Sequence, residues 1–323
     1  ALADDFPLIG CCAVQCNTTC DGSLMGNGIE ARSFKIPTFQ LAVPIRHRQE
    51  SVQEYAAEEV VNAIHFIEEQ TGEKFDWDAF FKSMKRFNAE TEEFLEWMEI
   101  SKTDYPQVMG VTLALYRYGV YQAAGGRNQA FLDMDKKLTK MALDAYKSKE
   151  MAAKEYRHRA MTWGVQAAYY TALPIWLLNC WGVVTIADML SMVSTEMVNT
   201  EDKHQAMLDL AYLYENMIMR NRSNGGYETG VEALWRFCEM FNIDIVIMYV
   251  HMGCKSMSGY HGLFEEEARK HGIHLIWVTH NLMCPEDGTR RDMRTEINRY
   301  MRTVFREEPL DPSLEDFDDS KSW

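Results

Sequence analysis

The feature that most constrains the fold is residues 243–250, an apolar segment with the sequence Ile-Asp-Ile-Val-Ile-Met-Tyr-Val. Its β-branched residues and its length favour a buried strand. We expect a helix with a polar start over 228–241 before it and a helix with a charged face over 263–270 after it. A second apolar segment, 273–278, follows the glycine that ends this second helix. Strand, loop, helix and strand in this order predict a right-handed parallel crossover, and therefore an α/β fold.

Cysteines lie where two predicted strands end. Cys254 follows the strand just described, three residues after His251. Cys20 follows a short apolar strand predicted over 6–14 and a polar loop that contains Cys16. Ligands of open parallel sheets bind at the carboxyl ends of the strands. If both strands belonged to one sheet, Cys20 and Cys254 would lie at the same edge.

The remaining chain alternates between sheet-forming and helical segments. Helices are expected over 49–70 and 131–160, and strands over 34–43, 176–178 and 183–186. We expect flavodoxin-like parallel sheet domains with a helical insertion. The predicted parts are a portion of a first α/β sheet domain (1–48), a helical insertion or subdomain (49–160), a second α/β domain (161–306) and an acidic tail (307–323). Because the chain enters a strand almost at once, the start of the first domain is expected upstream of Ala1. Residues 307–319 carry seven acidic residues and no basic one, so we expect a solvated tail.

Charge and hydropathy exclude several classes of function. The formal net charge of −15 argues against nucleic acid or an anionic membrane as the main partner. The longest apolar run, 173–189, is interrupted by Pro174, Asn179, Gly182 and Asp188, so it does not predict a membrane span. The first residues lack the basic and apolar regions of a signal peptide. We therefore expect a cytoplasmic protein with no membrane or nucleic acid partner.

The eight cysteines are expected to be free thiols or metal ligands, because no secretory signal accompanies them. Cys180 and Cys238 have apolar neighbours and are predicted to be buried core thiols. The sequence has no phosphate-binding loop, no dinucleotide-binding fingerprint and no serine nucleophile elbow. The four N-terminal cysteines lack the paired spacing of zinc sites. An iron-sulfur cluster held by thiolates from separate strand loops accounts better for cysteines at two strand ends.

Several segments form a family pattern. The most specific are the run Cys-Asn-Thr-Thr-Cys-Asp-Gly over 16–22, the Glu-rich helix over 51–71 and the late cysteine after an apolar strand. Others are Ser-Asn-Gly-Gly-Tyr (223–227), Cys-Lys (254–255), Arg-Asp-Met-Arg (291–294) and Glu-Pro-Leu-Asp-Pro (308–312). Together they resemble the 2-hydroxyacyl-CoA dehydratases, in particular their larger, α-type subunit. The resemblance covers essentially the whole chain.

This resemblance implies a [4Fe-4S] cluster in each subunit of a heterodimer, held by three cysteines. Cys20 and Cys254 match two of these ligands. The family's first ligand normally lies tens of residues before the Cys20 run, and that region is not in this sequence. The third ligand is therefore expected upstream of Ala1, and otherwise Cys16, or one of the two cysteines before it, takes its place.

The implied activity is oxygen-sensitive removal of water from (R)-2-hydroxyglutaryl-CoA, or a related 2-hydroxyacyl-CoA, in anaerobic amino acid fermentation. The product is the 2-enoyl-CoA. One electron added to the thioester carbonyl gives a ketyl radical anion, which can expel the hydroxyl group. The implied partners are a β-type subunit and an ATP-hydrolysing iron-sulfur activator, and a flavin (FMN) accompanies the cluster in some relatives.

Catalytic residues are not identified by the resemblance. His251, beside Cys254, is the one candidate proton carrier, although a structural histidine fits the same position. Three alternatives to the dehydratase remain open: a subunit of the benzoyl-CoA reductase type, a non-catalytic electron-relay subunit, and an iron-free CoA-binding scaffold.

Overall fold

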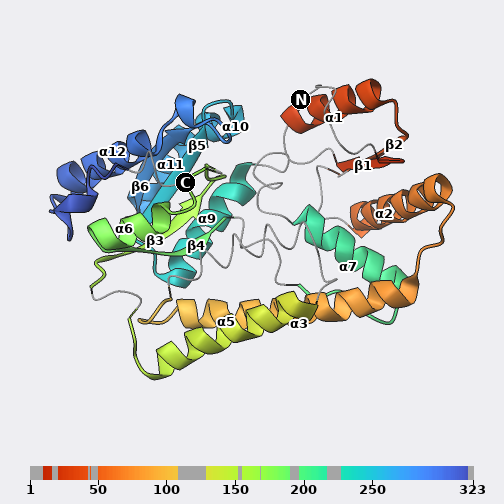
Figure 1. Cartoon of the computed structure of the whole chain (residues 1–323), viewed down its shortest axis with the longest axis horizontal. Helices are drawn as coiled ribbons and strands as arrows, with labels where there is room; N and C mark the ends of the chain where they lie inside the picture. The colour runs from red at the N-terminus through yellow and green to blue at the C-terminus, as the bar shows by residue number, and fades with distance from the viewer. Residues whose placement is uncertain are drawn as a thin grey trace. The chain divides into compact units, whose positions relative to one another are not determined.

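The computed structural model describes residues 10–16, 21–42, 44, 50–107, 129–151, 155–167, 169–189, 196–216 and 227–318. The chain divides into two compact units. Unit 1 comprises residues 1–91 and 194–230, and unit 2 comprises residues 92–193 and 231–323. Each unit combines parallel strands with helices (Figure 1), which confirms the predicted α/β fold class. No helix in the described ranges is long and apolar enough to cross a membrane.

Unit 1 contains a small parallel sheet. Strands β1 (Ala13–Cys16) and β2 (Thr38–Leu41) pair in parallel and are connected through a helix. The helices of this unit are α1 (Asp21–Phe34), α2 (Glu50–Thr71), the first part of α3 (Trp77–Ser101) and α7 (Lys203–Glu215). The hydroxyl of Tyr214 in α7 donates to the carbonyl of Ala56 in α2 at 2.9 Å, which ties these two helices together.

Two sequence expectations differ from the structure of unit 1. Cys16 is the last residue of β1 rather than part of a loop. The strand expected over 34–43 begins only at Thr38, because helix α1 extends to Phe34. The sequence pattern does not predict α1, since three glycines within it lower its intrinsic helix propensity. Cys20 lies outside the described residues.

Unit 2 is built on a four-stranded sheet in which every pair of neighbours is parallel. The strands, in spatial order, are β4 (Val183–Asp188), β3 (His158–Trp163), β5 (Ile245–His251) and β6 (His274–His280). β5 and β6 are the two strands predicted from the apolar segments, with α11 (His261–His271) between them, so the predicted parallel connection through a helix is confirmed. His251 pairs with His280 at the end of this ladder, and both strands therefore stop at the same level.

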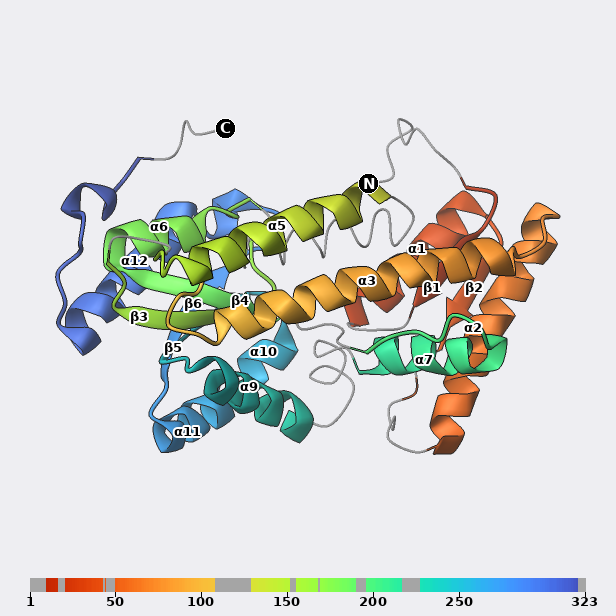
Figure 2. The ribbon, with the colours of Figure 1, turned by 90° about the horizontal axis from the view of Figure 1, so that it is seen from below.

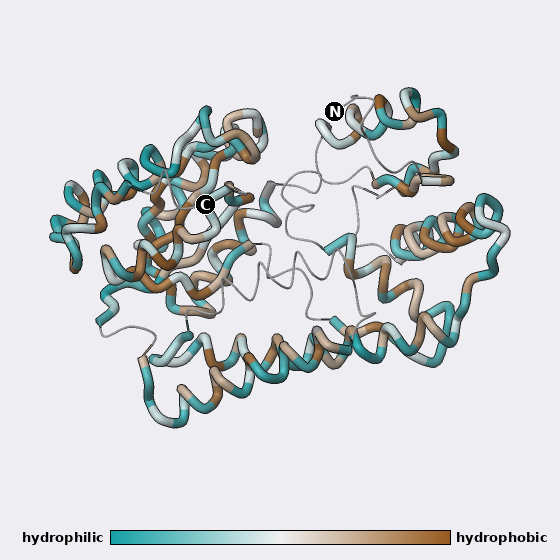
Figure 3. Tube along the Cα trace, in the orientation of Figure 1, coloured by the Kyte–Doolittle hydropathy of each residue, from teal (hydrophilic) through white to brown (hydrophobic). Residues whose placement is uncertain are grey.

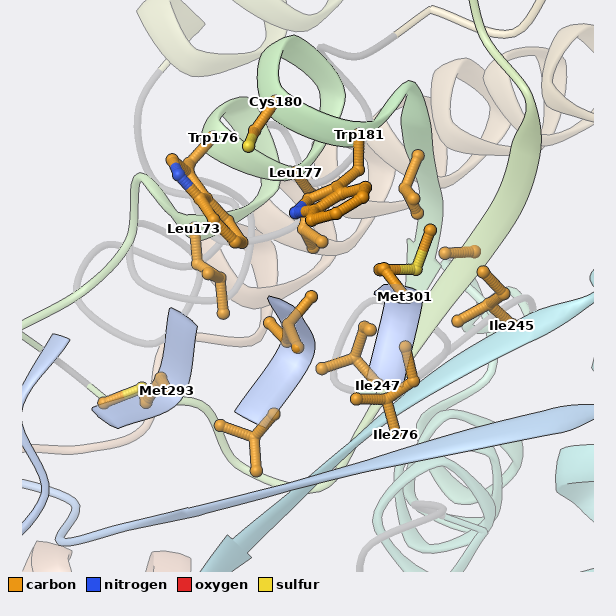
Figure 4. Packing of buried hydrophobic residues seen from close by; sticks show 14 of the residues in the cluster. Leu173, Trp176, Leu177, Cys180, Trp181, Ile245, Ile247, Ile276, Met293 and Met301 are labelled. Carbon is orange, nitrogen blue, oxygen red and sulfur yellow. The ribbon is translucent and has the colours of Figure 1, made fainter. Parts of the chain in front are cut away.

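Helices cover both faces of this sheet. Figure 2 shows α6 (Leu173–Trp181) and α12 (Arg290–Tyr300) on one face, and α9 (Tyr227–Phe241) with α11 on the other. The buried core under α6 and α12 is formed by Leu173, Leu177, Trp181, Ile245, Ile247, Ile276, Val278, Met293, Ile297 and Met301 (Figure 4). Figure 3 shows hydrophobic residues gathered in the strands of this unit. Each fully buried side chain of this kind contributes about 1.5–3 kcal/mol to folding.

Helix α6 replaces the strand expected over 176–178. Its sequence is apolar on all sides, and such a segment does not reveal by its pattern whether it is a buried strand or a buried helix. Pro174 occupies the first turn, and Gly182 ends the helix in a left-handed conformation with φ 70°. The helix is further fixed by Trp181, whose indole N–H donates to Oδ1 of Asn298 in α12 at 2.8 Å.

Strand β3 begins within the helix expected over 131–160 and continues beyond it. Helix α5 (Gln129–Lys147) ends earlier, and Lys149 has a positive φ of 55°. The chain then reaches β3, whose central residues Ala160 and Met161 are not β-branched, so its sequence gives little strand signal. Because β3 pairs with both β4 and β5, the sheet contains a central strand that the sequence pattern does not predict.

Residues 307–318 fold back onto the rest of unit 2, while most of them remain exposed to solvent. They follow a short π-helix, η5 (Met301–Phe305), and contain the 3₁₀ turn η6 (Pro312–Leu314). The amide of Leu310 donates to the carbonyl of Cys180 at 2.7 Å, and the indole of Trp176 donates to the carbonyl of Leu314 at 2.8 Å. The acidic composition of this segment therefore does not prevent it from docking on α6.

Candidate functional site

The candidate site is the carboxyl edge of the sheet in unit 2, where β5 and β6 end side by side. The loop after β5 carries Cys254, and the loop after β6 carries Cys284. His251 and His280 are the last residues of the two strands and are paired in register. Two thiols and two imidazoles thus belong to neighbouring strand ends, in the region where open α/β sheets bind ligands.

Backbone hydrogen bonds fix the position of Cys254. The Met252 amide donates to the carbonyl of His280 at 3.0 Å, which ties the two loops together. The Cys254 amide donates to the carbonyl of His251 at 2.8 Å, and the turn leads into the short helix α10 (Lys255–Gly259). The carbonyl of Cys254 accepts bonds from the amide and the hydroxyl of Ser258 at 3.2 and 3.1 Å. The thiol is therefore presented from a defined backbone.

Among the cysteines of unit 2, Cys254 has the surroundings that best suit a ligand. A thiol binds metal as the thiolate. Burial raises the pKa of Cys180 and of Cys238 to about 12, so both are inert core thiols. The thiol of Cys284 donates to Oε2 of Glu286 at 3.0 Å, and this bond raises its pKa. Cys254 is free and half-buried, and within the described chain its sulfur makes no hydrogen bond.

The imidazole of His251 covers the turn that leads to Cys254. Its Nδ1 lies 3.4 Å from the carbonyl oxygen of His280. A Cβ atom placed on Gly253 would lie 3.2 Å from Nε2 of His251, so the ring is close to the backbone of the turn. The side chain of His251 is half-buried, which leaves part of it accessible from the edge of the sheet.

His280 and Tyr249 form a buried polar pair behind this loop, which sequence reasoning missed. Their rings meet edge to face with centroids 5.7 Å apart. In the described part of the chain, neither ring nitrogen of His280 nor the Tyr249 hydroxyl forms a hydrogen bond of normal geometry. The backbone groups of Val165 and Asn281 lie close to the His280 ring. Burial lowers the pKa of His280, and nearby backbone groups offset this only in part, so the imidazole is held neutral. The sequence places His280 in a loop, and only the register with His251 reveals its position.

The loop after β3 passes unusually close to this pair. Gly164 has φ 102°, and a Cβ atom at this position would lie 2.3 Å from the carbonyl oxygen of Tyr249. Only glycine allows the two backbones to approach this closely.

Aromatic and basic residues connect helix α12 to the loops of the candidate site. The buried guanidinium of Arg294 donates to the hydroxyl of Tyr170 at 3.1 Å. The guanidinium groups of Arg290 and Arg294 each lie 5.8 Å from the centre of the Tyr170 ring, a distance that allows cation–π attraction. The hydroxyl of Tyr169 donates to the carbonyl of Gly288 in the loop after β6. These contacts connect the start of α12 to the loops of the carboxyl edge.

Unit 2 does not hold a complete metal site in its described residues, since no group of three or more His, Cys, Asp or Glu side chains is arranged to bind a metal. It offers Cys254 as a single suitable thiol. The strand before Cys20 is β1, which pairs with β2 in unit 1, whereas Cys254 follows β5 of the four-stranded sheet. The two strands therefore do not belong to one sheet, and Cys20 itself lies outside the described residues. Of the other N-terminal cysteines, Cys11 and Cys12 have sulfur atoms 4.0 Å apart.

Comparison with models of protein families shows the family to which the chain belongs. The family model for the D-component of 2-hydroxyglutaryl-CoA dehydratase matches residues 3–300. The chain belongs to this family. A search of curated proteins returned no match. The match places the D-component family over both units, and over Cys20, His251 and Cys254.

Membership of the D-component family confirms part of the resemblance seen in the sequence. It identifies a component of a dehydratase, and therefore a subunit of a multi-subunit enzyme. The cysteine at the end of β5 was the most specific sequence mark together with the Cys20 run. The structure adds the fixed loop around Cys254 and the buried pair of His280 and Tyr249.

Proposed function

We propose that this chain is the α-type subunit of a 2-hydroxyacyl-CoA dehydratase and binds a [4Fe-4S] cluster through Cys20 and Cys254. The observation that carries the proposal is the free thiol of Cys254, presented from a fixed loop at the carboxyl edge of a parallel sheet. The dehydratase family and this donor chemistry support each other, because thiolates are the usual ligands of iron-sulfur clusters. Within this sequence, Cys16 is the candidate for a third ligand.

The residues around Cys254 have roles that follow from their surroundings. The hydrogen-bonded turn holds the thiol in place without using its sulfur. The half-buried ring of His251 lies over the turn, where it is the candidate proton carrier. The neutral imidazole of His280 keeps positive charge away from the interior of the site. A bound cluster would supply one-electron transfer and a Lewis-acidic iron, which a dehydration through a ketyl radical requires.

The substrate we propose is (R)-2-hydroxyglutaryl-CoA or a related 2-hydroxyacyl-CoA, with the 2-enoyl-CoA as product. The enzyme would act in the cytoplasm with a β-type subunit, an ATP-hydrolysing iron-sulfur activator and, as in some relatives, FMN. The family match supports the dehydratase class, whereas the acyl group rests on the sequence resemblance alone.

The test is anaerobic turnover by the heterodimer with activator and ATP, comparing Cys254→Ser with Cys238→Ser. We expect enoyl-CoA formation to be lost in the first variant and kept in the second, because Cys238 is an inert core thiol. Full turnover of 2-hydroxyacyl-CoA by Cys254→Ser contradicts the assignment of this ligand. Turnover of benzoyl-CoA in place of 2-hydroxyacyl-CoA supports a reductase-type subunit instead.

A further inference from the structure

Residues 307–318 are here called the C-terminal strap. Its first residue, Glu307, is one of two carboxylates that are bridged by a histidine, His158. His158 is the first residue of β3, at the amino-terminal edge of the sheet. Its Nδ1 lies 2.8 Å from Oδ2 of Asp244, and its Nε2 lies 2.9 Å from Oε1 of Glu307. The side chain of His158 is 12% exposed. One mostly buried imidazole therefore joins the loop before β5 to the first residue of the strap.

This geometry requires a proton on each nitrogen of the ring. Ionised carboxylates only accept hydrogen bonds, and a neutral imidazole has a single N–H to donate. Only the imidazolium form satisfies Asp244 and Glu307 together. Burial lowers the pKa of His158, but the hydrogen bonds and charges of the two carboxylates outweigh it, so the pKa lies above its ordinary value of 6.5.

The other groups around His158 leave this electrostatic arrangement in place. Arg157 lies 3.3 Å from the second oxygen of Glu307 and also donates to the carbonyl of Glu308 at 2.8 Å. The ring of Phe305 stacks at an angle on His158, with centroids 4.5 Å apart, and meets His274 from β6 in the same way at 4.4 Å. Further out, Glu155 pairs with Arg157, and the Tyr300 hydroxyl is bonded to His274.

The far end of the strap reaches the support of the candidate site. Glu315 forms two bonds with Arg302, at 2.6 and 2.7 Å. The carbonyl of Phe317 accepts a bond from Arg294 at 2.7 Å, and the same guanidinium holds Tyr170. The strap thus connects the amino-terminal edge of the sheet with Arg294, which is bonded to Tyr170 in the loop after β3.

We propose that the C-terminal strap is a pH-sensitive fastening, in which protonated His158 holds Glu307 and loss of that proton releases the start of the strap. The stabilisation is fully present below the ordinary pKa of histidine and is lost as the pH rises through the higher pKa of the folded protein. Contacts that do not titrate in this range remain along the strap: Arg157 with Glu307 and Glu308, the Leu310 amide with the Cys180 carbonyl, and Arg302 with Glu308 and Glu315. Loss of the His158 proton therefore weakens the attachment of residues 307–311, which lie nearest the histidine, and leaves the distal part in place. This inference does not depend on the proposed function.

The test is hydrogen exchange followed by mass spectrometry on the whole chain between about pH 5 and about pH 9, with rates corrected for intrinsic exchange. We expect protection of residues 307–311 to fall about tenfold as the pH rises, which corresponds to the loss of one charge-assisted bond. In His158→Gln this protection should be low at every pH. The control is His204→Gln, which removes an exposed histidine that faces only Glu54.

A second variant keeps the proposal testable if His158→Gln does not fold. Glu307→Gln leaves the histidine in place and removes the carboxylate charge, so the strap should exchange rapidly even at low pH. The proposal is overturned if the protection of 307–311 in the wild type is independent of pH. It is equally overturned if both Glu307→Gln and His158→Gln keep the pH dependence of the wild type.

Discussion

Unit 2 requires a glycine at a position where two backbone segments come close together. Gly164 in the loop after β3 lies against the carbonyl of Tyr249, and its φ of 102° belongs to a region that side chains rarely adopt. This approach brings the loop over the buried pair of Tyr249 and His280. The site therefore depends on a glycine that has no chemical role of its own.

We predict that Gly164→Ala destabilises the protein by more than about 1 kcal/mol, since a methyl group would overlap the Tyr249 carbonyl. The control is Gly259→Ala, whose added Cβ would meet no atom within 4 Å. Urea denaturation measures both variants. Equal stability of the two variants would show that the loop moves aside without cost.

The buried histidine makes a second prediction at this scale. In the described chain, neither ring nitrogen of His280 forms a hydrogen bond of normal geometry, and buried polar groups left in this way cost about 1–3 kcal/mol each. Replacing it by leucine should therefore leave the free energy of unfolding unchanged or raise it. Thermal denaturation checks this, and a loss of more than about 2 kcal/mol would mean that the ring is hydrogen-bonded after all.

At the scale of elements, the sequence predicts those whose pattern is local. Strands β5 and β6 with the helix between them follow from two apolar runs and a charged helix, and they place Cys254 correctly at a strand end. Helix α6 could not be told from a strand, because a short segment that is almost entirely apolar shows no helical alternation of polar and apolar residues. Strand β3 lacks a strand composition, and its central place comes from its neighbours. The position of His280 at the end of β6, beside His251, is likewise known only from the pairing of β5 with β6.

Arg159 of β3 joins three elements through carbonyl groups. Its guanidinium donates to Ser101 at the end of α3 at 2.7 Å, and to Thr103 and Phe241 at 2.9 Å. Because the side chain is buried, removing it leaves these acceptors without a donor. We predict that Arg159→Met lowers the free energy of unfolding by about 3 kcal/mol, measured by denaturant titration. A change below about 1 kcal/mol would show that water replaces the guanidinium.

Helix α12 begins with a capping box formed by Thr289 and Asp292, and this box makes the stability of the helix depend on pH. Asp292 accepts bonds from the amide and hydroxyl of Thr289 at 3.0 and 2.8 Å, and these bonds lower its pKa. A lowered pKa means that the stabilisation exists above the unfolded pKa and disappears as the pH falls through the folded one. Asp292→Asn should cost about 1 kcal/mol at neutral pH and little in strong acid. Circular dichroism melts across this range test it, and a cost that does not vary with pH would contradict it.

At the scale of the whole molecule, the two cysteines proposed as cluster ligands belong to different units. Unit 2 supplies Cys254 from a fixed loop, and Cys20 follows β1 of unit 1. The family match spans both units, as expected if they work together in one dehydratase component. Sequence reasoning identified both cysteines because each follows an apolar strand. The sequence alone does not predict the distance between the two sulfur atoms, because that distance depends on contacts between distant parts of the chain.

The most direct test of the central claim is the iron content of a cysteine double-variant cycle after anaerobic reconstitution. Wild type, Cys20→Ser, Cys254→Ser and the double variant are compared, with Cys238→Ser as the control. If both thiols hold one cluster, each single variant loses that cluster and the double variant loses no more. Iron losses that add up in the double variant would place the two cysteines in separate sites and contradict the account.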